Sequence, residues 1–117
     1  MPAELRPSQA LHLWHDVVFD LVRDHPAPDL TQRQLAVLLT VYLEPPPHTV
    51  RGLAQKLGVT KPVITRALDT MGRLKLVTRK RDETDRRNVL VHRTVEGALA
   101  VERLGDAIIA RYRALPP

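Results

Sequence analysis

The residues with the clearest chemical potential are residues 82–91, which read DETDRRNVLV. Turn-forming and charged residues here separate two short runs with strand character, at residues 76–81 and 88–92. This pattern predicts a β-hairpin with a charged tip. Arginines gathered at the tip of a hairpin gain little from a protein core, whereas they can pair well with a polyanion.

The net charge of +5 is unevenly distributed along the 117 residues. Residues 51–93 hold twelve Lys and Arg against four Asp and Glu, a net charge of +8, so the other 74 residues carry −3. Such segregation points to a face that meets nucleic acid or an anionic membrane. Charge alone is equally compatible with an ordinary solvated basic surface.

Length and composition restrict the class of protein. We expect one domain, residues 1–117, with a modest core. The chain has no cysteine, so it has no disulfide framework, cysteine-rich zinc site or thiol chemistry. The longest nearly apolar run, residues 35–43, is too short to span a bilayer, and the first residues lack signal-peptide architecture, so we expect a cytoplasmic protein. No phosphate-binding glycine loop, paired metal-ligand motif or nucleophile elbow is present, and we expect no enzyme.

Hydrophobic periodicity and cap residues predict five helices. We expect them at about residues 9–24, from Asp29 or Thr31 to about residue 43, and at about residues 50–57, 60–74 and 95–113. The residues expected to begin or end them are Ser8, Pro26, Pro28, Thr49, Gly58, Thr60 and Thr94. In the fourth helix, Val63 or Ile64 should face the core with Ala67, Leu68 and Met71.

The order helix, tight turn, helix and basic hairpin is that of a winged helix-turn-helix. The fold class is therefore mainly α with a small β-hairpin wing (α+β). The polar residues on the outward face of the helix at 60–74 are Thr60, Lys61, Thr65 and Arg66, which suits the major groove of DNA. The hairpin at 77–92 is slim enough for the minor groove, whose negative potential favours arginine.

Two motifs carry a resemblance to a known family. Residues 53–69, LAQKLGVTKPVITRALD, resemble the helix-turn-helix of the MarR family of bacterial transcriptional regulators. Residues 85–91, DRRNVLV, followed by TVEG at 94–97, resemble that family's wing and the entry to its next helix. The resemblance runs from about residue 30 to residue 104.

The resemblance implies a homodimeric repressor on a pseudo-palindromic operator, with the helix at 60–74 in the major groove and the wing in the minor groove. It implies that Asp85 orients Arg87 into the minor groove and that Arg86 makes a phosphate or supporting contact. Alternatively, Asp85 and Arg87 merely pair across the turn. The expected DNA-binding residues are Thr49, Arg51, Thr60, Lys61, Pro62, Thr65, Arg66, Arg79, Arg81, Asp85, Arg86 and Arg87.

The resemblance also divides the chain into a DNA-binding core at residues 30–93 and dimerisation helices at 8–25 and 95–113. The expected dimer-interface residues are Leu11, Trp14, Val18, Leu104, Ile108 and Tyr112. Their broad apolar stripes favour a homodimer, and the alternative is that they close over the monomer's own core. Double-stranded DNA and a second copy of the chain are the expected partners, without a membrane, in the cytoplasm and associated with the nucleoid.

The sequence departs from the family pattern at two places. Lys75 stands where the family usually has a glycine in a left-handed turn, so either this lysine is strained or the turn differs. Family members normally carry two C-terminal helices, whereas this sequence predicts one, so we expect a reduced dimerisation region.

Two further kinds of site are open. His12, His15 and Asp16 have the helical spacing i, i+3, i+4 and could bind a transition metal, but two histidines on a helix are more often surface or interface residues, and we expect no metal. The family often binds small aromatic acids as effectors, but nothing here specifies one, and we expect no cofactor. The competing function is a sequence-indifferent or architectural winged helix that binds DNA or another protein.

Overall fold

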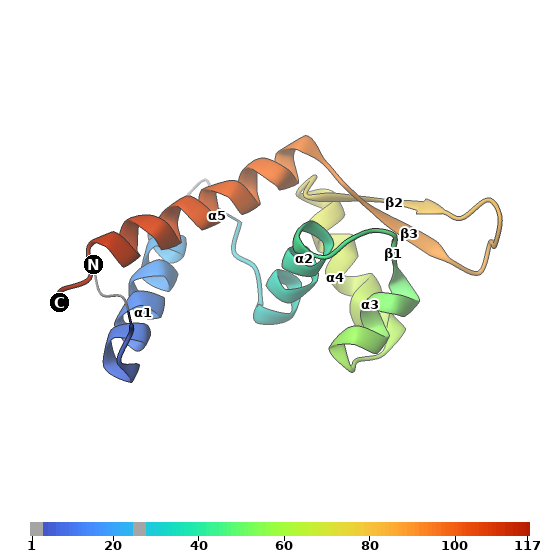
Figure 1. Ribbon diagram of the computed structural model, residues 1–117. Helices are drawn as coiled ribbons and strands as arrows, with labels where there is room; N and C mark the ends of the chain where they lie inside the picture. Colours follow the sequence, from blue (N-terminus) through green and yellow to red (C-terminus); the bar gives the residue numbers. More distant parts are fainter. Residues whose placement is uncertain (1–3, 25–27) are drawn as a thin grey trace. The chain divides into compact units, whose positions relative to one another are not determined.

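The computed structural model describes residues 4–24 and 28–117. Figure 1 shows the order of its elements: α1 (Pro7–Arg23), α2 (Gln32–Leu43), β1 (His48–Thr49), α3 (Val50–Leu57), α4 (Lys61–Arg73), β2 (Val77–Arg81), β3 (Val89–Arg93) and α5 (Val95–Arg113). The described residues form two compact units. Residues 30–101 make the winged unit, and the terminal unit combines residues up to 29 with residues 102–117. The helix α5 begins in the winged unit and ends in the terminal unit.

Side-chain caps fix the helices that precede the wing. The hydroxyl of Thr31 accepts a hydrogen bond from the amide of Gln34, whose side chain accepts in return from the Thr31 amide, so α2 begins at a capping box. The hydroxyl of Thr49 accepts from the amide of Gly52 at the start of α3. Gly58 ends α3 with φ 67° and ψ 34°, a left-handed conformation that glycine adopts without strain. These starts and ends confirm the predictions from sequence.

The start of α4 differs in one detail from the prediction. Thr60 occupies the N-cap position, and Pro62 lies in the first turn, as expected. The Thr60 hydroxyl, however, makes no capping hydrogen bond. Its carbonyl instead accepts from the amides of Val63 and Ile64. Thr60 is thus an exposed N-cap residue whose hydroxyl does not cap the helix.

The sheet has three strands, in the order β1-β3-β2, and all neighbours are antiparallel. The hairpin of β2 and β3 confirms the prediction, with Arg79 opposite Val91 and Arg81 opposite Val89. The sequence analysis did not predict β1. This two-residue strand has no periodicity of its own, and it exists because His48 and Thr49 pair with Val91 and Leu90 across the chain. We call β2, β3 and the connecting residues 82–88 the wing.

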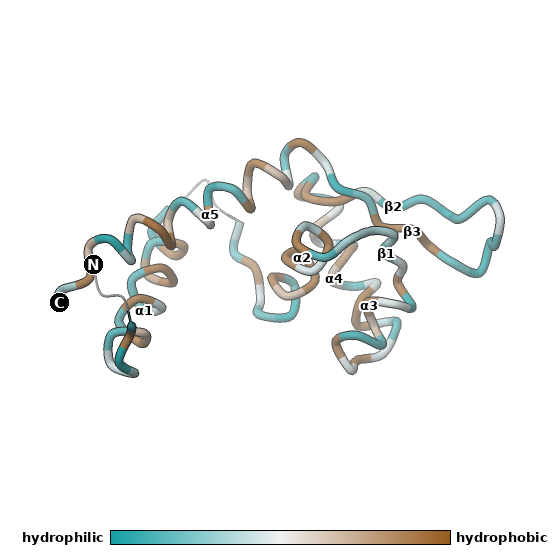
Figure 2. The backbone as a smooth tube through the Cα atoms, in the orientation of Figure 1, coloured by the Kyte–Doolittle hydropathy of each residue, from teal (hydrophilic) through white to brown (hydrophobic). Residues whose placement is uncertain are grey.

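The core of the winged unit lies between α2, α3, α4 and the base of the sheet. Its most deeply buried side chains are those of Ile64, Leu68, Met71, Val37, Val41 and Val77. Ile64 is fully buried whereas Val63 is only partly so, which resolves the open alternative on α4. This core fixes α4 with its opposite, polar face toward solvent, and Figure 2 shows the hydrophilic tip of the wing beyond it.

A partly buried tyrosine ties the start of α5 to the rest of the winged unit. The Tyr42 hydroxyl donates to the carbonyl of Leu76 (2.7 Å) and accepts from the amide of Thr94 (2.9 Å). The Thr94 hydroxyl accepts from the amide of Gly97 and donates to the carbonyl of Lys75, confirming Thr94 as the cap. A Cβ at Gly97 would overlap the Tyr42 hydroxyl and the Leu76 carbonyl, so only glycine fits there.

The terminal unit packs α1 against the end of α5 around Val17 and Leu115. Arg111 makes two hydrogen bonds to the Asp20 carboxylate, at 2.6 and 2.7 Å. The Arg111 side-chain bond is the main reason that the pKa of Asp20 lies below its usual value. The side chain of Gln9 donates to the carbonyl of Pro116. These polar contacts hold the chain ends together where the apolar core is small.

The prediction that Ser8 caps the first helix is wrong. The helix begins at Pro7, and Arg6 is its N-cap. Proline suits this first position because its missing N–H would have no partner there, and the Gln9 side chain accepts the amide of Arg6. At the other end, the predicted limit at residue 25 and the role of Pro26 lie outside the described residues.

Candidate nucleic-acid interface

The N-terminal half of α4 presents the polar face that the sequence predicts. Thr60, Lys61, Pro62, Thr65 and Arg66 are all exposed, while Ile64, Ala67, Leu68 and Met71 on the opposite face are buried. Because helix dipoles place partial positive charge at the N-terminus, this end of α4 favours an anion even without its side chains.

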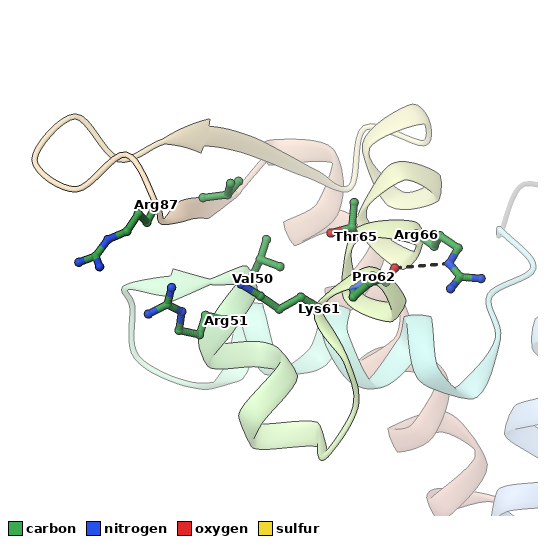
Figure 3. Close-up of a pocket in the computed structure, with 8 residues that line it drawn as sticks. Val50, Arg51, Lys61, Pro62, Thr65, Arg66 and Arg87 are labelled. Atoms are coloured by element: carbon green, nitrogen blue, oxygen red, sulfur yellow. Dashed lines mark hydrogen bonds between the residues drawn. The ribbon is translucent and has the colours of Figure 1, made fainter.

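Side chains from three regions meet around that end of α4. They line an open pocket of about 560 Å³, and Figure 3 shows how the lining side chains lie. It is lined by Val50 and Arg51 of α3, four residues of α4, and Arg87 and Val89 of the wing; the four from α4 are Lys61, Pro62, Thr65 and Arg66. Six of the predicted DNA-binding residues are therefore brought together: Arg51, Lys61, Pro62, Thr65, Arg66 and Arg87. Four of the eight lining residues are cationic and none is acidic, so the pocket suits a polyanion.

Sequence reasoning missed the two apolar residues of this pocket, Val50 and Val89. Val50 begins α3 and is buried, and Val89 begins β3 and is partly buried. Nothing in their types marks them as site residues. The available signal was their position at the start of an element: Val50 directly precedes the predicted cation Arg51, and Val89 comes two residues after the predicted cation Arg87.

Arg87 is held in place by Asp85. Its Nε lies 3.0 Å from one carboxylate oxygen of Asp85, and its terminal nitrogen lies 3.1 Å from the other. The Arg87 amide also donates to Asp85, so the pair closes a tight turn. The Arg87 side chain is the main reason that the pKa of Asp85 is lowered, and Asp85 in turn raises the pKa of Arg87. Both groups therefore stay charged at neutral pH, and the exposed guanidinium has a defined orientation.

The tip of the wing is organised by its own hydrogen bonds. The Asp82 carboxylate accepts from the amide and the hydroxyl of Thr84, and these bonds lower the pKa of Asp82, that from the hydroxyl most strongly. The amide of Asn88 donates to the carbonyl of Asp85, and the Arg81 guanidinium donates to the carbonyl of Arg86 at 2.6 Å. These hydrogen bonds give the loop that carries Arg86 and Arg87 a defined conformation.

Several predicted DNA-binding residues contact the protein itself. Arg79 of β2 pairs with Asp69 of α4 at 2.7 Å, and so joins the wing to the helix. The Thr49 hydroxyl caps α3, and Arg81 braces the wing tip. Arg66 makes one long bond (3.4 Å) back to the carbonyl of Pro62, and Figure 3 shows its guanidinium directed away from those of Arg51 and Arg87.

The sequence matches a known protein family. A family model described as the MarR family matches residues 29–88, from just before α2 to the end of the wing tip. The chain belongs to the MarR family. It is accordingly a winged-helix DNA-binding regulator of transcription and not an enzyme. No curated protein gives a significant match to the sequence.

Solved structures share the fold at low sequence identity. The transcriptional regulator Tm0710 from Thermotoga maritima is 22% identical, with a TM-score of 0.73 over 90% of this chain and 70% of its own. MepR from S. aureus, in a complex with DNA, is 21% identical, with a TM-score of 0.77 over 92% and 85%. The transcriptional repressor CouR, bound to a 23-mer DNA duplex, is 24% identical, with a TM-score of 0.71 over 90% and 70%.

Among the described residues, none of the helices is both long and apolar enough to cross a membrane.

Proposed function

We propose that this MarR-family protein is a homodimeric repressor that binds a pseudo-palindromic operator, with α4 in the major groove and the wing in the flanking minor groove. One observation carries the proposal: Arg51, Lys61 and Arg87 come from three separate elements and line one pocket at the N-terminal half of α4. MepR and CouR, which share the fold, were solved with DNA, and CouR is described as a repressor. The protein would act in the cytoplasm, on the nucleoid.

On α4, base reading falls to Lys61, Thr65 and Arg66, which are exposed on its outward face. Lys61 and Arg66 have the reach and charge for guanine edges, while Thr65 suits a hydrogen bond to several bases. Thr49 and Arg51 at the start of α3, and Thr60 and Pro62 at the start of α4, serve phosphate contact and close approach of the backbone. Because Arg66 bonds only weakly to Pro62, little is lost when it turns toward DNA.

In the wing, Arg87 is the minor-groove contact, Asp85 orients it, and Arg86 contacts phosphate. An arginine inserted into a narrow minor groove meets strong negative potential, and pre-orientation by Asp85 reduces the freedom lost on binding. Arg79 and Arg81 support this contact from within the protein, through Asp69 and the carbonyl of Arg86.

The homodimer rests on apolar side chains that a single chain leaves in water. On α1, Leu11 is 70% exposed, Trp14 50% and Val18 37%. On α5, Ile108 is 39% exposed, and Leu104 and Tyr112 are partly buried. Two copies that cover these stripes would use residues 8–25 and 95–113 for dimerisation and leave residues 30–93 for DNA. Residue 25 lies outside the described part of the chain.

Selection of bound DNA from a random pool tests the function. We expect one enriched inverted repeat whose half-sites lie about 10 bp apart, or a multiple of that, because two symmetric recognition helices meet successive major grooves. Affinity for this operator and for random DNA should then be compared at several salt concentrations, since phosphate contacts alone are sequence-blind and steeply salt-dependent. Equal affinities for both, with no enriched motif, would refute the operator and support a sequence-indifferent DNA-binding module.

A further inference from the structure

Two histidines and an aspartate on α1 bring their donor atoms together outside the DNA interface. His12, His15 and Asp16 offer one ligand atom each, and these three atoms all lie within 4.8 Å of one another. His12 Nε2 is 3.5 Å from one Asp16 oxygen, and His15 Nδ1 is 3.0 Å from the other. One turn of a single helix therefore gathers two imidazoles around one carboxylate.

These separations are those of a coordination sphere. Nitrogen and oxygen ligands lie about 2.0–2.2 Å from a zinc ion, so neighbouring ligands of one ion are roughly 3.0–3.5 Å apart. Both histidine–aspartate distances already fall in this interval. Because these two contacts use different oxygens, Asp16 would bind the ion through both oxygens or turn one of them toward both imidazoles. The two histidines would also have to approach each other, which their exposure of 62% and 69% allows.

The Asp16 carboxylate makes its ion pairs with the two histidines. The next acidic residue along α1, Asp20, is held by two bonds from Arg111. Arg23 lies over the ring of Phe19, 5.5 Å from its centre, and the same ring faces that of His15. Asp16 is 21% exposed and has the two imidazoles as its ion-pair partners. Arg111 also attracts Asp16 electrostatically, but its hydrogen bonds go to Asp20. A cation between the three side chains would therefore meet a carboxylate that makes no hydrogen bond to an arginine among the described residues.

We propose that His12, His15 and Asp16 bind one divalent transition-metal ion per chain, of the class of Zn²⁺ or Ni²⁺. Two imidazole nitrogens favour such ions over Mg²⁺ and Ca²⁺, which take oxygen ligands. The high exposure of the histidines leaves the remaining positions of the ion to water. An ion that joins residues i, i+3 and i+4 also stabilises the helix that carries them. The proposal is independent of the function proposed above for the DNA interface.

Calorimetric titration of the full chain with Zn²⁺ tests the site. We expect saturable binding of one ion per chain, with no comparable signal from Mg²⁺. The substitutions His12→Gln, His15→Gln and Asp16→Asn should each weaken binding by about tenfold or more, as the loss even of an outer-shell partner does. His92→Gln is the matched control, because His92 is an exposed histidine on β3 outside the cluster, and it should leave binding unchanged.

A second readout does not depend on any variant. In NMR spectra of the imidazole nitrogens, Zn²⁺ should shift the signals of His12 and His15 and leave those of His48 and His92 in place. The site is refuted if wild-type protein shows no saturable Zn²⁺ binding, if one ion requires two chains, or if the three substitutions leave the affinity as it was. Equal shifts at His92 would likewise assign the binding to scattered histidines.

Discussion

Arg87 combines exposure with a fixed orientation, which is unusual for a long surface side chain. Its side chain is 78% exposed, yet both Asp85 oxygens hold its guanidinium. An exposed ion pair of this kind contributes little to folding. The pair therefore fits a role in binding better than one in stability.

Replacing Arg87 with Ala should weaken operator binding by about 1–3 kcal/mol and leave folding unchanged, because its side-chain hydrogen bonds within the described residues go to Asp85 in an exposed pair. Fluorescence anisotropy with labelled operator measures the affinity, and circular dichroism checks the fold. Arg103→Ala, which removes the same charge from an exposed position on α5, is the control and should have a much smaller effect. Equal losses in both variants would mean that Arg87 acts only through net charge.

Lys75 adopts a left-handed backbone conformation with φ 62°, in the turn between α4 and β2. The surrounding bonds impose it: the amide of Leu76 reaches the carbonyl of Met71, and the Lys75 carbonyl accepts from Thr94. Of the two alternatives from sequence, a strained lysine or a different turn, the structure has the strained lysine.

Lys75→Gly should raise the free energy of unfolding by about 0.5–1 kcal/mol. The substitution removes the steric cost of a side chain in the left-handed conformation, and this cost exceeds the extra entropy that glycine has in the unfolded chain. Urea denaturation measures the change. Lys56→Gly, in the last turn of α3, is the matched control and should lower stability by about 1 kcal/mol, since its backbone is helical. Destabilisation by both substitutions would contradict the left-handed turn at Lys75.

At the scale of elements, the two threonines that precede α3 and α4 occupy the same position but make different bonds. Thr49 accepts a capping bond from Gly52, and Thr60 makes none. Thr49→Ala should therefore lower the free energy of unfolding by about 1 kcal/mol, and Thr60→Ala by clearly less. Chemical denaturation of the two variants side by side measures this. Equal losses would show that the Thr60 hydroxyl caps α4 in solution.

The junction of α2, β2 and α5 depends on a missing side chain. Gly97→Ala places a methyl group against the Tyr42 hydroxyl and the Leu76 carbonyl, and this overpacking should cost about 1–3 kcal/mol. Gly105→Ala in the same helix meets open space and should raise stability by about 0.5–1 kcal/mol. Thermal unfolding should separate the two variants in opposite directions, and a neutral Gly97→Ala would contradict the packing of Tyr42 at this junction.

Much of the fold could be predicted from local signals. Thr31, Thr49, Gly58 and Thr94 mark helix ends through chemistry within a few residues, and their predictions are confirmed. The strand β1 could not be predicted, because its pairing with β3 joins residues about 40 apart. The pair of Asp69 and Arg79, likewise, exists only once α4 and β2 are packed. The sequence thus identifies the cationic residues, but it does not show which of them pair with other parts of the protein and support the wing.

For the whole molecule, charge and exposed apolar surface are separated along the chain. The segment at 51–93 carries +8, while the terminal unit leaves Leu11 and Trp14 of α1 in water. Figure 2 shows hydrophobic stretches recurring along α1. A basic segment and exposed apolar side chains on different parts of the sequence are what the proposed homodimer requires.

Trp14→Glu should therefore convert the proposed homodimer into monomers, because it places a charge in the centre of the exposed stripe, where Trp14 is 50% exposed. Sedimentation at micromolar concentration should give twice the chain mass of 13.2 kDa for the wild type and 13.2 kDa for the variant. Gln55→Glu adds the same charge on α3 and should stay dimeric.

Operator affinity should fall steeply with Trp14→Glu, since two half-sites are then no longer held by one molecule. A wild type that sediments only at 13.2 kDa would refute the dimer and leave the exposed stripe of α1 to a different partner.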